Sequence, residues 1–173
     1  MPSHFKKLVK SASDDDLLDA LTAELQRLLP PAIQANYPEL VAAIQRLPIG
    51  LRSMAATHRL DVSMSLDDLG WHFYNFHDRA YAEETLAGLL ELEAAEVADI
   101  FQAAYDLVSP QWEEIGKFDS RSGDAFAKWY SKSPLNKALD PLNLRLWAIC
   151  NEQPNGLMQF WLDYARKYPE RLQ

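Results

Sequence analysis

Apolar residues recur at helical spacing near the start of the chain. Four leucines follow one another at intervals of three or four residues, at Leu17, Leu21, Leu25 and Leu28. Residues spaced in this way share one face of an α-helix, and that face can be buried. Ser13 precedes the run and suits the N-cap position, whereas Pro30 ends the run. The pattern predicts a helix from Asp14 to Leu28.

Less regular apolar spacing continues up to the middle of the chain. A second helix is expected at Pro38–Leu47, and Pro48 suits the first turn of a third helix, where a missing N–H group costs nothing. The polar segment Asp61–Ser65 then predicts a connection. An aromatic helix is expected at Leu66–Phe76, which holds the densest group of aromatic rings in the sequence.

The aromatic helix has an apolar stripe along one side. Its members are Leu66, Leu69, Phe73 and Phe76, which recur at helical spacing. Ser65 and Asp68 resemble a capping box, in which two side chains bond to each other's backbone N–H groups at the start of a helix. The stripe is therefore expected to be buried, and the helix to begin near Leu66.

Two amphipathic helices and several shorter ones complete the pattern. The amphipathic pair is expected at Ala80–Glu91 and Ala94–Val108. A short helix after Pro110 and a loop at Lys117–Asp124 come next. The remaining helical segments are expected at Ala125–Tyr130, Leu135–Leu139, Leu142–Ile149 and Leu157–Tyr164. Two of these begin with a Ser-Pro or Asp-Pro pair, which supplies a cap and a first-turn proline.

No segment of the sequence alternates apolar and polar residues with the period of two that is typical of a strand. The sequence therefore predicts an all-α fold, a single-domain multi-helix bundle of about eight helices over residues 13–173. Residues 1–12 are expected to form a flexible N-terminal arm. A chain of 173 residues can bury roughly 70% of its unfolded surface in one domain.

Negative charge is concentrated in the middle third of the chain. The formal net charge is −8, yet residues 61–114 contain thirteen acidic residues and one basic residue, whereas the segments before and after carry net charges of +1 and +3. Direct binding of nucleic acid is not expected, because phosphates are bound through Lys and Arg. Neither a signal peptide nor an apolar run of roughly 18 residues is visible, so we expect a cytoplasmic protein without membrane contact.

Nine carboxylates, and no Lys or Arg, lie between Ala80 and Gly116. An ordinary surface helix mixes the two signs, because opposite charges one turn apart stabilise it. We interpret the segment as a helical hairpin that presents carboxylates to a basic protein partner, such as a nucleic-acid-binding protein. The candidate partner-binding residues are Glu83, Glu84, Glu91, Glu93, Glu96, Asp99, Asp106, Glu113 and Glu114.

Three interpretations of these charges remain open. A DNA mimic would occupy a nucleic-acid-binding surface, although two adjacent helices would present only about one carboxylate per 3 Å, against about 1.7 Å per charge in duplex DNA. An immunity-type inhibitor of a basic toxin would use the same attraction. A face that only keeps the protein soluble would need no partner.

A polar stripe on the aromatic helix suggests an enzyme as a different class of function. Asp68, His72, Asn75 and Arg79 are spaced four, three and four residues apart. A carboxylate one turn before an imidazole can orient it and raise its pKa, as a general base requires. The alternative is that these residues form the polar edge of an otherwise buried helix, with no catalytic role.

No cofactor or metal site is expected. His72 and His77 do not share a helical face, and neither a zinc-protease motif nor a cysteine pair accompanies them. Cys150 is interpreted as a small core residue. The aromatic residues near the C-terminus are expected in the core, with a homodimer contact as the alternative, since Trp and Tyr are enriched at interfaces.

Two stretches resemble a known bacterial family. GWHFYNFHDRAYAEETLAGLLELEAAEVADIFQAAYDLV combines an aromatic run, a bend and paired helices, and LNLRLWAICNEQPNGLMQFWLDYARKYPERL forms the tail. Both are similar to the family labelled domain of unknown function 4375, named for its DNA-mimic member. Family members tend to carry an Asn-Gly-Gly turn where this chain has residues 66–70. The resemblance implies an all-helical fold, and a non-enzymatic, protein-binding role for at least one member of the family.

Overall fold

The computed structural model describes residues 8–118 and 123–173. No described residue lies in a strand, so the predicted all-α fold is confirmed, although with more helices than the expected number of about eight. In chain order the helices are α2 (Asp14–Leu28), α3 (Pro31–Gln34), α4 (Tyr37–Ile44), α5 (Ile49–Leu66), α6 (Leu69–Asn75), α7 (Arg79–Glu91), α8 (Ala95–Val108), η1 (Ser109–Gln111), α9 (Trp112–Ile115), α10 (Asp124–Tyr130), α11 (Pro134–Glu152), α12 (Met158–Lys167) and η2 (Pro169–Leu172). Residues 8–11 are also helical.

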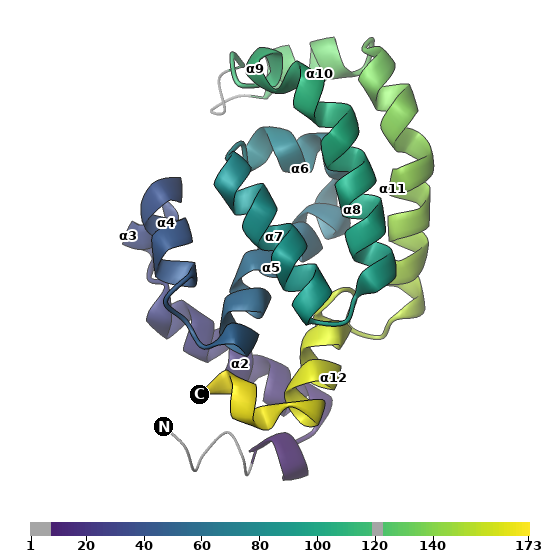
Figure 1. Ribbon diagram of the computed structural model, residues 1–173. Coiled ribbons are helices and arrows are strands. Elements are labelled where there is room, and N and C mark those ends of the chain that lie inside the picture. Colours follow the sequence, from purple (N-terminus) through teal and green to yellow (C-terminus); the bar gives the residue numbers. More distant parts are fainter. Residues whose placement is uncertain (1–7, 119–122) are drawn as a thin grey trace.

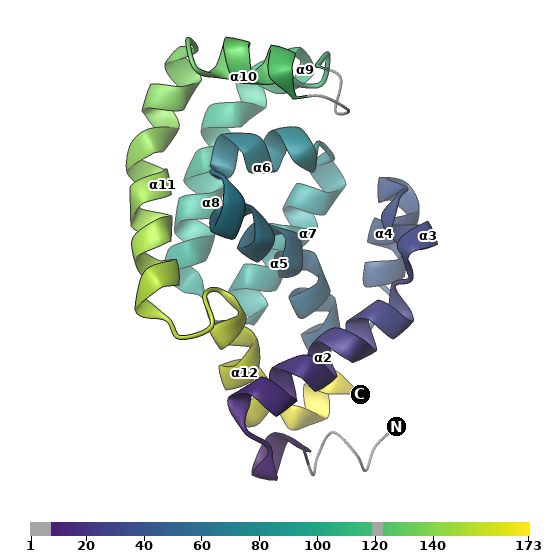
Figure 2. The ribbon, with the colours of Figure 1, turned by 180° about the vertical axis from the view of Figure 1, so that it is seen from behind.

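Helix α5 lies in the middle of the molecule, with α7 packed along it (Figure 1). One cluster of buried side chains lies where α6, α8, α10 and α11 meet, and it includes Phe73, Phe101 and Phe126. A second cluster joins α2, α4 and α12 to α5, with Ile44 and Trp161 among its members. Seen from behind, α2 crosses the end of α5 near α12 (Figure 2). Thus α5 contributes to both clusters.

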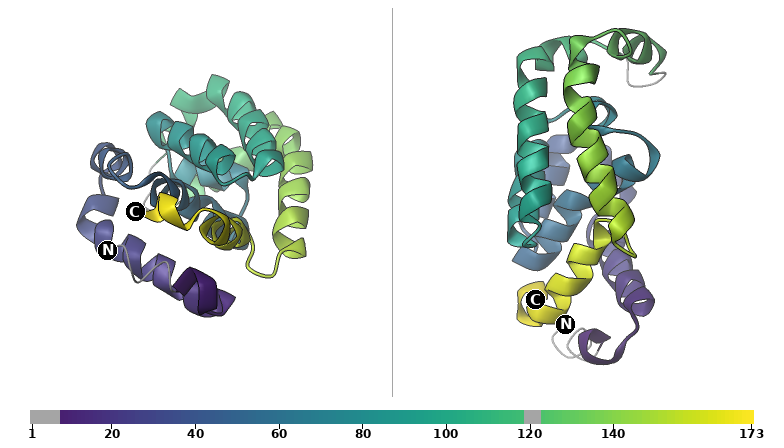
Figure 3. Two further views of the ribbon diagram at one scale, coloured as in Figure 1. Left: turned by 60° about the horizontal axis from the view of Figure 1, so that its bottom comes forward. Right: turned by 90° about the vertical axis from the view of Figure 1, so that its right-hand side faces the viewer.

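Helices α8 and α11 lie side by side along their lengths (Figure 3, right). Helix α11 buries Leu135, Leu139 and Leu146. The segment was predicted as two helices separated at Pro141, and that prediction is wrong. Pro141 is exposed on the outer side of a continuous helix. A proline in a helix removes one backbone hydrogen bond, and we attribute the continuity to burial of the leucines on the inner side.

The predicted first helix is confirmed at both ends. It spans Asp14–Leu28, and the Ser13 hydroxyl accepts a hydrogen bond of 3.1 Å from the N–H of Asp16. Of the expected N-terminal arm, residues 1–7 lie outside the described residues. In its described part Val9 is buried, and the guanidinium of Arg166 in α12 donates to the Val9 carbonyl. Residues 8–12 are thus attached to the C-terminal helix.

The expected connection at Asp61–Ser65 is wrong, because α5 continues through it to Leu66. Asp61 is buried, and its Oδ1 accepts a hydrogen bond of 2.9 Å from the N–H of Leu157, ninety-six residues later. The hydroxyls of Ser63 and Ser65 donate to carbonyls one turn earlier in the same helix. The polar side chains that suggested a loop are therefore satisfied inside a helix.

The aromatic helix begins three residues later than predicted, at Leu69. The predicted capping box is absent, since Asp68 alone is the N-cap and accepts a hydrogen bond of 2.9 Å from the N–H of Trp71. Leu66 is 76% exposed at the end of α5, which contradicts its place in the buried stripe. Leu69 and Phe73 are fully buried, as predicted, whereas Phe76 is only partly buried.

Gly70 is required by a close approach between α6 and α10. A Cβ atom at this position would lie 2.3 Å from the ring of Tyr130, whose hydroxyl is bonded to Asp68. We expect Gly70→Ala to lower the free energy of unfolding by about 1–3 kcal/mol, because the buried Tyr130 ring must shift. Urea unfolding measures this loss. As a control, the loss should shrink in a Tyr130→Leu background, and an equal loss there would contradict the assigned clash.

Candidate functional site

Helices α7 and α8 form the predicted hairpin, with bounds within one residue of those expected (Figure 1). The Asp78 side chain caps α7 by accepting a hydrogen bond of 2.8 Å from the N–H of Tyr81. Glu93, in the turn between the helices, adopts a left-handed backbone with φ of 60°. The hairpin positions most of the nine candidate carboxylates, and η1 with α9 positions the last two.

Glu84 does not face a partner, which corrects the prediction for this residue. Its side chain is 9% exposed and lies between α7, α5 and the end of α4. Its carboxylate accepts two hydrogen bonds of 2.9 Å from the Arg52 guanidinium and one of 2.7 Å from the Gln45 amide. A buried carboxylate held by three donors stabilises the helix packing and is unavailable to another protein.

The carboxylates at the turn of the hairpin are paired with the C-terminal segment. Glu91 accepts from the guanidinium of Arg171 and from the hydroxyl of Tyr164. Burial and Glu91 together raise the pKa of Tyr164 to about 12. Glu93 accepts hydrogen bonds of 2.6 Å from Lys167 and from the Tyr168 hydroxyl, and these bonds lower the pKa of Glu93.

Two more carboxylates have basic neighbours at the surface. Glu96 in α8 lies 3.2 Å from the guanidinium of Arg145 in α11, and Glu114 lies 2.7 Å from Lys117. Both pairs are exposed, so solvent screens them and they add little to stability. In the sequence, no Lys or Arg lies between Ala80 and Gly116. In the structure, however, five of the nine carboxylates form an ion pair with a Lys or Arg from outside that segment. The net positive C-terminal third was the signal for four of these pairs, whereas the partner of Glu84 is Arg52 in the first third of the chain.

Four of the candidate carboxylates belong to no ion pair within the described part of the chain, and all four are exposed. They are Glu83 on α7, Asp99 and Asp106 on α8, and Glu113 on α9. Asp99 and Asp106 are two helical turns apart, about 10 Å along the axis, and therefore share a face. We call these four residues the acidic surface.

Arg79 contributes a positive charge next to the acidic surface, at the start of α7. Its guanidinium lies 4.7 Å from the centre of the Trp112 ring and 3.5 Å from the Tyr105 hydroxyl. Stacking on an aromatic face holds a guanidinium in place without neutralising it. Arg79 is thus held on α8 and α9 aromatic rings, while the neighbouring carboxylates point to solvent.

The predicted polar stripe does not form a catalytic unit. His72 is 1% exposed, and its Nδ1 lies 2.9 Å from the Ser63 hydroxyl, while Asp68 caps α6 and accepts from Tyr130. Burial lowers the pKa of His72 to about 3, the opposite of what the proposed carboxylate–imidazole pair requires. The prediction failed because Asp68 lies before the first turn of α6, where its side chain bonds to the backbone.

Asn75 and Arg79, the other two residues of the predicted polar stripe, lie in different surroundings. The Asn75 carbonyl accepts a hydrogen bond of 3.1 Å from the hydroxyl of Tyr37, and Asn75 is exposed at the end of α6. Arg79 lies in the next helix, against Trp112. The four residues therefore lie on no common cleft, and the polar-edge interpretation fits Asn75 alone.

His77 and Cys150, the other side chains considered for metal binding or catalysis, are packed against neighbouring residues. His77 stacks on Trp112 with ring centres 4.3 Å apart, and burial lowers the pKa of this histidine. Cys150 is partly buried against the first core cluster, and burial raises the pKa of its thiol to about 11. Within residues 8–118 and 123–173, no three His, Cys, Asp or Glu side chains are grouped so as to hold a metal ion. No described helix is both long and apolar enough to cross a membrane.

Comparison with known proteins gives one match. The sequence model of the family described as DMP19-like protein matches residues 45–168. This range covers α5 to α12 and excludes α2, α3, α4 and η2. No curated protein and no solved structure matches the chain.

Proposed function

Because the chain belongs to the DMP19-like protein family, we propose that it is a non-enzymatic protein that binds a basic surface of another protein. The observation that carries the proposal is the acidic surface, where Glu83, Asp99, Asp106 and Glu113 are exposed and form no ion pair with another described residue, although Lys and Arg residues elsewhere in the chain pair with their neighbours. Exposed carboxylates that form no internal ion pair can attract a basic protein surface and speed its association.

The more specific proposal is a DNA mimic, in which the partner's basic surface is one that otherwise binds nucleic acid. The acidic surface supports it, because its residues lie on α7, α8 and α9, and packing of α8 against both α7 and α11 holds the hairpin in place. Internal ion pairs leave fewer free carboxylates than the sequence implied, so the imitation of duplex DNA would be partial.

Charge reversal tests the proposal against a matched control. We expect Glu83→Lys, Asp99→Lys and Asp106→Lys together to weaken binding about 100-fold or more, because an exposed ion pair contributes up to about 1 kcal/mol and reversal adds repulsion. The control reverses Asp19, Glu152 and Glu170, which are exposed and unpaired among the described residues and lie elsewhere. Both triples change the net charge from −8 to −2, since each substitution adds two.

The partner is first captured from a bacterial lysate at low salt and then titrated with each purified variant. Affinity should fall between about 0.05 M and about 0.5 M salt, because the screening length passes below about 10 Å in that range. Equal losses from the two triples, or an affinity independent of salt, would refute the acidic surface as the site. Displacement by duplex DNA supports the mimic, whereas its absence limits the function to protein binding such as toxin inhibition.

A further inference from the structure

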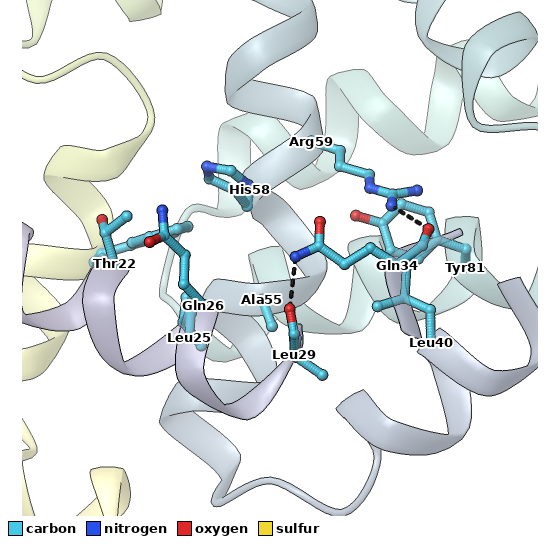
Figure 4. Close-up of a pocket in the computed structure, with 11 residues that line it drawn as sticks. Thr22, Leu25, Gln26, Leu29, Gln34, Leu40, Ala55, His58, Arg59 and Tyr81 are labelled. Carbon is cyan, nitrogen blue, oxygen red and sulfur yellow. Dashed lines mark hydrogen bonds between the residues drawn. The ribbon is translucent and has the colours of Figure 1, made fainter. Parts of the chain in front are cut away.

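A cavity of about 140 Å³ lies where α2 and α3 pack against α5 (Figure 4). The cavity is lined both by residues that precede the range of the family match and by residues within that range. Leu25 of α2 and Gln34 of α3 precede residue 45, while Ala55 of α5 and Trp161 of α12 follow it. The cavity therefore exists only where the N-terminal helices of this chain meet the region shared with the family.

Apolar and aromatic side chains make up six of the eleven residues that line the cavity, and several of them are held in place. Leu25, Ala55, Tyr81 and Trp161 are all buried. The Trp161 indole N–H donates to the Thr57 hydroxyl at 3.0 Å, and the Tyr81 hydroxyl donates to the Ala56 carbonyl at 3.0 Å. Both rings thus have their polar atoms satisfied by α5, which leaves their apolar faces to line the space.

A positive charge lies at the edge of this apolar space. The Arg59 guanidinium is about 5 Å from three ring centres, those of Tyr37, Phe76 and Tyr81, and one of its N–H groups donates to the Gln34 carbonyl at 2.9 Å (Figure 4). No carboxylate of the described chain forms an ion pair with it. A guanidinium has five N–H donors and suits a carboxylate, which it binds through two parallel hydrogen bonds.

The remaining polar side chains that line the cavity add no negative charge, since they are those of Thr22, Gln26, Gln34 and His58. Gln34 is held in place, because its side-chain amide N–H donates to the Leu29 carbonyl at 2.6 Å while its backbone carbonyl accepts from Arg59. His58 lies against Trp161 with ring centres 5.8 Å apart, and burial lowers the pKa of this histidine, so its ring is neutral at pH 7. Asp61, one turn from His58 on α5, is bonded to Leu157. Arg59 therefore sets the charge preference of the cavity.

We propose that this cavity binds a small carboxylate carrying a single apolar ring, with benzoate as the simplest example. A cavity of about 150 Å³ with apolar walls accepts one benzene ring. The ring would lie against Leu25, Ala55 and Trp161, and the carboxylate would accept hydrogen bonds from Arg59. The net charge of −8 repels anions in general, so benzoate binding requires a local cation such as Arg59.

Titration with benzoate and with neutral benzamide, followed by NMR of backbone amides and the Trp161 indole N–H, tests the proposal. We expect saturable benzoate binding with a dissociation constant near or below about 1 mM, typical of the affinity of so small a ligand. Benzamide should bind at least about tenfold more weakly, because the carboxylate–guanidinium pair is lost. The shifts should centre on Ala55, His58 and Trp161.

Two variants and a control distinguish the contribution of the Arg59 charge from the contribution of the cavity volume. Arg59→Gln should reduce benzoate affinity to that of benzamide, whereas Arg46→Gln, which removes an exposed charge in the turn between α4 and α5, should leave it unchanged. Ala55→Leu should abolish binding of both compounds by filling the floor of the cavity. If Ala55→Leu does not fold, the comparison of benzoate with benzamide on the unmodified protein still tests the proposal. Equal affinity for the two compounds, shifts centred elsewhere, or no saturation by about 10 mM (about tenfold above the expected constant) would overturn the proposal.

Discussion

Replacing Phe73 with alanine is expected to lower the free energy of unfolding by about 3–5 kcal/mol, the range for removing a fully buried phenyl ring. Phe73 is 0% exposed at the centre of the first core cluster. Its ring lies 5.2 Å from that of Phe101 and 5.9 Å from that of Tyr105, both on α8. Truncation would leave a void between α6 and α8 that neither helix can close without losing other contacts.

Phe76 on the same helix supplies the control for this measurement. The apolar spacing of the sequence gives both phenylalanines the same buried role, but Phe76 is only partly buried and lies under the Arg59 guanidinium. Phe76→Ala should therefore cost less than about 3 kcal/mol in urea unfolding, the lower limit for a fully buried ring. A loss for Phe76→Ala that equals or exceeds the loss for Phe73→Ala would contradict the burial of the two rings described above.

Acid is expected to destabilise the protein through His72. Burial lowers the pKa of this histidine from 6.5 to about 3. Between these two pH values His72 is therefore protonated in the unfolded chain but neutral in the folded protein. The stabilisation is complete above pH 6.5 and is lost progressively as the pH falls toward 3. Between pH 6.5 and about pH 4.5 the loss is on the order of 2 kcal/mol, since each pH unit contributes about 1.4 kcal/mol at most.

The measurement compares urea unfolding of the natural protein and of His72→Gln at several pH values. Glutamine does not titrate and retains a partner for the Ser63 hydroxyl. Burial raises the pKa values of Asp61 and Asp68, which act with the opposite sign, but both proteins contain these carboxyl groups. The stability difference between the proteins should therefore narrow as the pH falls from 7 to about 4.5. A difference independent of pH would show that His72 is not the group responsible.

Local sequence patterns predicted most of the helices correctly. The predictions that were wrong share one cause. Ser13 and the leucine spacing located α2 to the residue. The expected breaks at Asp61–Ser65 and at Pro141 both lie inside continuous helices. A local pattern cannot reveal that Asp61 has a hydrogen-bond donor in Leu157, or that burial on the inner side of α11 accompanies a proline on its outer side.

The sequence by itself determined that this chain is helical and that its acidic residues cluster in the middle third, because helix periodicity and composition are properties of neighbouring positions. Only the tertiary structure decided which carboxylates remain free. Glu84, Glu91 and Glu93 have partners that are 32, 80 and 74 residues away, in α5, η2 and α12. The Arg59 cavity likewise depends on helices far apart in the chain. Charge pairing and cavities depend on distance in space, which packing of the helices sets and spacing along the sequence does not.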